Sequence, residues 1–68
     1  MKINLYLKSL SLSERNELAQ KVGTTGRYLS RIAYGRMKVL PGPKLSIKLA
    51  EELNGDVNLA ECRPDIWG

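Results

Sequence analysis

The sequence predicts an all-α fold, a compact bundle of about five short helices in a single domain that spans residues 1–68. Apolar residues recur at helical spacing in four separate segments. Capping residue types or a proline stand near the start of most of these segments, and glycines follow where three of them end. No stretch alternates polar and apolar residues convincingly over the length of a strand.

The first two helices are predicted over about residues 2–9 and from about Ser11 or Ser13 onward. Ser11 and Glu14 have the spacing of a capping box at the start of the second helix. Gly23 stands where a left-handed C-cap glycine would end it. The inward-facing apolar residues are Ile3, Tyr6, Leu7 and Leu10 in the first helix, and Leu18, Ala19 and Val22 in the second.

The third helix is predicted between Thr25, a good N-cap residue, and Gly35, which supplies the stop. Its inward face is formed by Tyr28, Leu29, Ile32 and Ala33. The opposite side carries small or basic residues and no acid, namely Gly26, Arg27, Ser30 and Arg31. Such a face suits a polyanion.

The remainder of the chain predicts a surface loop over 36–43, a fourth helix and a final short turn. Pro43 fits the first turn of the fourth helix, and the Asn-Gly pair at 54–55 closes it. Residues 58–61 have capping-box spacing, and Pro64 is expected to end the last turn. The inward residues of the fourth helix are Leu45, Leu49, Ala50 and Leu53.

Charge is segregated along the chain, whose formal net charge is +4. Residues 15–48 hold eight basic residues against one acidic residue, a net charge of +7. Residues 51–68 hold five acids against Arg63, a net charge of −4. Either one end of the molecule faces an anionic partner, or these charges only solvate the surface.

The composition gives little support to catalysis. The chain has no histidine, one cysteine, no metal-ligand cluster and no glycine-rich phosphate loop, so we expect no enzyme activity, cofactor or metal. Cys62 is expected to be a small buried hydrophobic residue. The first residues do not have the pattern of a signal peptide, and no apolar run approaches a membrane span, so we expect a cytoplasmic protein without membrane contact.

Residues 14–34 have the spacing of a helix-turn-helix unit. Such a unit needs a small residue where the helices cross, a glycine at the turn and aliphatic anchors further on. These requirements are met, in order, by Ala19, Gly23, Leu29 and Ile32.

The segment 16–36, NELAQKVGTTGRYLSRIAYGR, resembles the DNA-binding region of lambdoid phage repressors and Cro proteins, most closely in ELAQKVGTT. The ending CRPDIWG resembles that of small prophage Cro-like regulators of the YdaS-like group. The resemblance covers about residues 11–68 and is most specific over 18–35. It implies a lambda-repressor-like domain.

The resemblance also implies roles for single residues. Arg15 would contact phosphate, and the groove-facing residues would be Thr25, Gly26, Arg27, Ser30 and Arg31. Gly26 departs from the family, whose members usually carry a longer polar side chain there. Base reading would then move to neighbouring residues, or the backbone would lie closer to the DNA. Replacing Gly26 with Ala is expected to leave the fold intact or slightly firmer.

For several residues, the sequence allows two interpretations of the contact with DNA. Arg27 is a candidate for a bidentate guanine contact or a phosphate clamp, and Arg31 for a phosphate or a base contact. Tyr28 is expected either to pack against its helix or to stack on a base, and its hydroxyl is a candidate for phosphate. The complete set of phosphate candidates is Arg15, Tyr28, Arg36, Lys38, Lys44 and Lys48, with plain solvation as the alternative for the lysines. Trp67 and Ile66 are expected either to fold back onto the first helix or to form a dimer contact.

These observations predict a sequence-specific double-stranded DNA-binding transcriptional regulator. A Cro-like repressor would bind a near-palindromic operator as a homodimer, formed in solution or only on DNA. The alternative is an antitoxin or another interaction module that acts on a protein partner through its acidic end.

Overall fold

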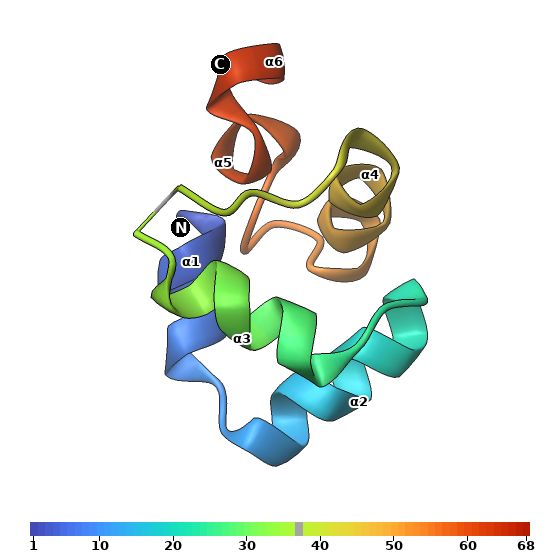
Figure 1. The fold of residues 1–68 in the computed structure, drawn as a ribbon. Coiled ribbons are helices and arrows are strands. Elements are labelled where there is room, and N and C mark those ends of the chain that lie inside the picture. Colours follow the sequence, from blue (N-terminus) through green and yellow to red (C-terminus); the bar gives the residue numbers. More distant parts are fainter. Residues whose placement is uncertain (37) are drawn as a thin grey trace.

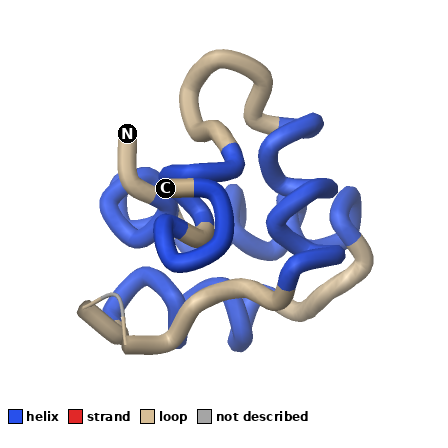
Figure 2. Tube along the Cα trace, turned by 90° about the horizontal axis from the view of Figure 1, so that it is seen from above, coloured by secondary structure: helices blue, strands red, loops and turns tan. Residues whose placement is uncertain are grey.

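A computed structural model describes residues 1–36 and 38–68, and in this part of the chain it contains six helices and no strand (Figure 1). Figure 2 shows the helices joined by loops. The all-α class is therefore confirmed, with one helix more than expected. The helices are α1 (Ile3–Ser9), α2 (Leu12–Val22), α3 (Gly26–Tyr34), α4 (Pro43–Glu52), α5 (Leu59–Cys62) and α6 (Pro64–Trp67).

The ends of α2 form as their sequence predicts. The Ser11 hydroxyl accepts a hydrogen bond from the Glu14 N–H, and the Glu14 carboxylate accepts one from the Ser11 N–H. These reciprocal bonds satisfy two backbone donors that the first turn leaves free. At the other end, Gly23 adopts a left-handed φ of 78° and donates its N–H to the Ala19 carbonyl.

The helix α3 begins at a capped residue and ends for a reason that the sequence did not reveal. The Thr25 hydroxyl accepts from the Tyr28 N–H at 3.1 Å. Gly35 ends α3 with an ordinary φ of −84°, and it is Arg36 that takes the left-handed conformation, at φ 51°. A Cβ on Gly35 would lie 2.8 Å from the Arg31 carbonyl oxygen. Gly35 is thus needed for space and not for its backbone angles.

The second half of the chain follows its proline and asparagine signals. Pro43 occupies the first turn of α4, and Asn58 with Glu61 forms a second capping box at α5. Pro64 ends α5 but also begins the extra helix α6, because a proline fits the first turn of a helix. Of the predicted loop 36–43, Met37 lies outside the described residues.

The core joins residues from α1 to α5, and α3 lies against both α1 and α2 (Figure 1). Most of the predicted inward residues are buried, while Tyr6, Leu10, Tyr28 and Leu45 pack at its edge and Ala50 is half-buried. Ser46 was not predicted but is fully buried, and its hydroxyl donates to the Pro41 carbonyl. The buried residues are Ile3, Leu7, Leu18, Ala19, Val22, Leu29, Ile32, Ala33, Leu49, Leu53, Val57 and Cys62.

The C-terminal residues pack on the helix that precedes them. The helix α6 packs against α5, and Ile66 is 47% exposed. Trp67 is half-buried and does not belong to the side chains that pack against the core. The main partner of α6 is therefore α5 and not the first helix.

The longest helix in the described part of the chain, α2, has 11 residues. None of the described helices combines the length and the apolar character needed to cross a membrane.

Candidate nucleic-acid interface

A tight turn holds α3 against α2. The N–H groups of Gly23 and Thr24 both donate to the Ala19 carbonyl, the latter at 2.9 Å. Thr25 then caps α3, so only three residues separate the two helices. Ala19 and Leu29 are buried where the helices pack. These contacts fix the direction of α3 relative to α2.

The outer face of α3 is open and cationic. Thr25, Arg27 and Arg31 are exposed, and together with Tyr28 they line a shallow hollow. Arg27 and Arg31 are four residues apart, so their guanidinium groups project from the same side of the helix. Neither forms an ion pair within the described residues. This face can accept an external anion or hydrogen-bond acceptor.

Tyr28 links α3 to the following loop. It is half-buried at the edge of the core, and its hydroxyl donates to the Leu40 carbonyl at 3.3 Å. The packing of this side chain agrees with expectation. The hydroxyl proposed for a phosphate contact is, in this structure, bound to the chain itself.

Two lysines of α4 lie beside the turn before α3. Lys44 and Lys48 are both exposed and line a second hollow together with Gly23 and Thr24. A Cβ placed on Gly23 would lie 3.7 Å from the Lys48 Nζ. Sequence reasoning missed this proximity because about 20 residues separate these lysines from the turn.

Arg36 and Lys38 follow the other end of α3. Both side chains are exposed, and neither forms an ion pair in the part of the chain that the structure describes. Cationic side chains are therefore present near both ends of α3.

Arg15 is not on the exposed surface. It is 8% exposed, and its Nη1 donates to the Ser30 Oγ at 2.9 Å. Its guanidinium carbon lies 5.4 Å from the centre of the Tyr34 ring, and the Lys8 ammonium lies 5.7 Å from the same centre. Both distances are within the range of a cation–π contact. The structure thus makes Arg15 a bridge between α2 and α3, and it leaves Ser30 half-buried.

Gly26, which is predicted to face the groove, is not exposed in the structure. Gly26 is buried against α2, and a Cβ there would collide with the Asn16 side-chain amide and lie 3.3 Å from the Asn16 Cα. The absence of a side chain lets the two helices approach each other. The close approach that the structure shows at this backbone is one between α3 and α2.

Acidic side chains are concentrated elsewhere and partly paired. Glu52 contacts Lys21 at 3.6 Å, Asp65 contacts Arg63 at 2.7 Å, and Glu61 pairs with the N-terminal ammonium. The Arg63 guanidinium lowers the pKa of Asp65, and the hydrogen bond from the N-terminal ammonium lowers the pKa of Glu61.

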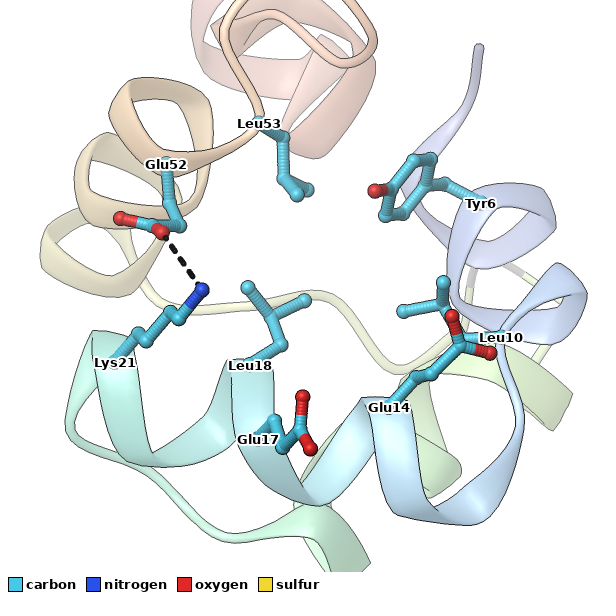
Figure 3. Close-up of a pocket in the computed structure, with 8 residues that line it drawn as sticks. All are labelled: Tyr6, Leu10, Glu14, Glu17, Leu18, Lys21, Glu52 and Leu53. Carbon is cyan, nitrogen blue, oxygen red and sulfur yellow. Dashed lines mark ion pairs between the residues drawn. The ribbon is translucent and has the colours of Figure 1, made fainter.

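A further hollow lies between α1, α2 and α4 and differs in character from the α3 face (Figure 3). Its lining includes three carboxylates, from Glu14, Glu17 and Glu52, against one ammonium, from Lys21. Such a lining repels phosphate. The described residues also contain no group of three or more His, Cys, Asp or Glu side chains that is placed to hold a metal ion.

Comparison with models of known protein families gave no match, and no curated protein matched the chain.

Proposed function

We propose that the protein is a sequence-specific double-stranded DNA-binding transcriptional regulator, a cytoplasmic Cro-like repressor that binds a near-palindromic operator as a homodimer. The observation that carries the proposal is the outer face of α3, where exposed Thr25, Arg27 and Arg31 surround a shallow hollow. No acidic side chain belongs to α3. Guanidinium groups on such a face suit the acceptor atoms of guanine in the major groove.

The dimensions of α3 support the same proposal. An α-helix with its side chains is about 10–12 Å across and fits the major groove, which is about 12 Å wide, and the nine residues of α3 form a helix roughly 13 Å long to lie in it. A helix of this size enters the groove with its N-terminal residues at the base edges. The Thr25 cap and Arg27 lie at that end of α3.

The cations around α3 support a docking geometry. Lys44 and Lys48 lie beside its N-terminal turn, while Arg36 and Lys38 follow its C-terminal end. Contacts from such side chains to phosphates fix the register of a protein on the duplex without reading sequence. We assign these four residues to the phosphates and Arg27, with Arg31 and Thr25, to the base edges.

The alternative, a protein partner held by the acidic end, receives less support. Three of the five acids in residues 51–68 already pair with cations of this chain, namely Glu52, Glu61 and Asp65. A partner would have to compete with these pairs.

The test is selection of bound duplexes from a random pool, followed by fluorescence anisotropy on the selected duplex between about 50 and 200 mM salt. We expect a near-palindromic site with half-sites about 10 bp apart, and an affinity that falls steeply with salt. Lys21→Ala is the control and should leave the affinity for the selected duplex unchanged, since Lys21 pairs with Glu52 away from the α3 face. A selected pool without a consensus, or an affinity that salt does not change, contradicts the proposal.

A further inference from the structure

We propose that Arg15 is a positioning residue that makes the Ser30 hydroxyl a hydrogen-bond donor toward the DNA, so that the protein discriminates against cytosine at one position of each half-site. The inference rests on the proposed function and adds a specificity determinant to it. It assigns Arg15 an indirect part in base reading, in place of a direct contact with phosphate.

In the hydrogen bond between Arg15 and Ser30, only Arg15 can be the donor. A guanidinium group donates hydrogen bonds and cannot accept them, so the Ser30 oxygen must be the acceptor of the 2.9 Å bond from Nη1. Burial and the ring of Tyr34 hold the guanidinium in place. Its Nε is buried without a hydrogen-bond partner, so no second bond draws the group away from Ser30.

This polarity restricts the other hydrogen bonds of the hydroxyl. A hydroxyl has one proton and two lone pairs; the bond from Arg15 uses one lone pair, and the adjacent positive charge repels the proton and strengthens it as a donor. Within the described residues, no acceptor takes a hydrogen bond from Ser30. Ser30 is half-buried and lies one helical turn after Arg27, at the edge of the exposed α3 face. Its O–H is therefore available to an acceptor outside the protein.

The bases differ in what they offer such a donor. In the major groove, guanine presents N7 and O6, adenine presents N7 and thymine presents O4, all of which accept hydrogen bonds. Cytosine presents only the N4 amine, which donates. The second lone pair of Ser30 could accept from that amine only by placing two donors, one of them the Arg15 cation, on the same oxygen, whereas a hydroxyl without the Arg15 bond would accept from it freely. We therefore expect the protein to bind less tightly when cytosine stands at the base that Ser30 contacts.

The test compares base preference in Arg15→Lys and Arg15→Gln, since lysine only donates whereas glutamine both donates and accepts. In duplex selection we expect the wild-type protein to disfavour cytosine at one half-site position by about 3- to 10-fold, the effect of one hydrogen bond. Arg15→Lys should keep this bias, while Arg15→Gln and Ser30→Ala should lose it at the same position. Lys8→Gln is the matched control, because it also removes a cation from the Tyr34 ring but has no contact with Ser30.

Each variant is first shown to be folded by circular dichroism and thermal melting. The inference is overturned if Arg15→Gln keeps the cytosine bias, or if Ser30→Ala leaves the base preference unchanged at every position. Should Arg15→Gln fail to fold, Arg15→Lys decides, and loss of the cytosine bias in folded Arg15→Lys overturns the inference. Failure of the wild-type protein to bind any duplex contradicts the proposed function itself, whereas selective binding that ignores Ser30 contradicts only this inference.

Discussion

The space beside Gly26 limits what this position tolerates. An added methyl group would force the Asn16 side chain to rotate and would still lie 3.3 Å from the Asn16 Cα. Overpacking of this kind costs about 1–3 kcal/mol, and the higher helix propensity of alanine offsets up to about 1 kcal/mol. We therefore expect Gly26→Ala to lower the free energy of unfolding by about 1 kcal/mol, measured by urea denaturation.

The control for this prediction is a double-mutant cycle with Asn16→Ala. Because the shorter side chain removes the colliding amide, the loss caused by Gly26→Ala should be smaller in that background. Additive effects of the two substitutions would show that the crowding at Asn16 is not the cause.

Arg27 and Lys44 are expected to contribute to DNA binding in different ways. Arg27 lies in the first turn of α3, and a bidentate guanine contact is worth about 1–3 kcal/mol of discrimination. Arg27→Ala should weaken the selected duplex much more than random duplex. Lys44→Ala should weaken both by a similar factor and lower the salt slope by about one unit. Anisotropy on both duplexes checks this, and an equal loss from Arg27→Ala on both would make Arg27 a phosphate clamp.

Local signals of single residues were predictable, and contacts across the fold were not. Ser11, Gly23 and Thr25 act on backbone groups within a few residues of themselves, so their spacing was sufficient to assign them. The contact of Arg15 with Ser30 depends on how α2 and α3 cross, and 15 residues separate the pair. The inward orientation of Gly26 depends on the same crossing.

At the level of elements, the carboxylates of Glu14 and Glu61, one at the start of α2 and one in α5, make the stability depend on acid pH. The hydrogen bonds from Ser11 lower the pKa of Glu14 below 4.5, and the N-terminal ammonium does the same for Glu61. A carboxylate whose pKa is lower in the folded state stabilises the fold above the pKa of the unfolded chain, and this contribution is lost as the pH falls through the folded value. We expect the melting temperature to decrease progressively as the pH falls below about 4.5.

Thermal melts between pH 7 and pH 2 check this expectation. Glu14→Gln should be less stable than the wild-type protein at pH 7 and should lose less stability on acidification, because its amide does not titrate. Equal acid sensitivity of the two proteins would show that the α2 capping box does not contribute to the pH dependence.

Helix starts and stops were predicted better than the number of helices. The periodic apolar residues of α1 to α4 extend over two or more turns, which is enough for the pattern to be recognised. The four residues of α6 are too few for any periodicity, and Pro64 was interpreted only as a stop. Ser46 is a polar residue on the buried side of α4, a position at which an apolar pattern gives no signal.

At the level of the whole molecule, Cys62 reports on the opening of the core. Its side chain is fully buried, and burial raises the pKa of the thiol to about 11. Because the thiolate is the reactive form, we expect very slow reaction with a disulfide reagent at pH 8 and a sharp increase in rate across the urea unfolding transition.

The same burial makes stability decrease at alkaline pH. The thiol of the unfolded chain ionises near 9.0, before the folded one, so the contribution of the protonated thiol is lost as the pH rises above that value. Cys62→Ser is the control, since its hydroxyl does not titrate in this range. Fast modification of the wild-type protein in native buffer would contradict the burial of Cys62.

The inward position of Gly26 also bears on how often a binding site for this protein would occur by chance. Operators compete with every similar sequence in a genome for the bound regulator. Each further base pair that the regulator specifies lowers the number of such sequences. A recognition helix with one outward side chain fewer specifies fewer base pairs. In a symmetric dimer the same loss occurs in both half-sites. The proposed repressor would therefore be expected to tolerate more sequence variation among its operators, and to depend on its concentration in the cell to distinguish them from the background.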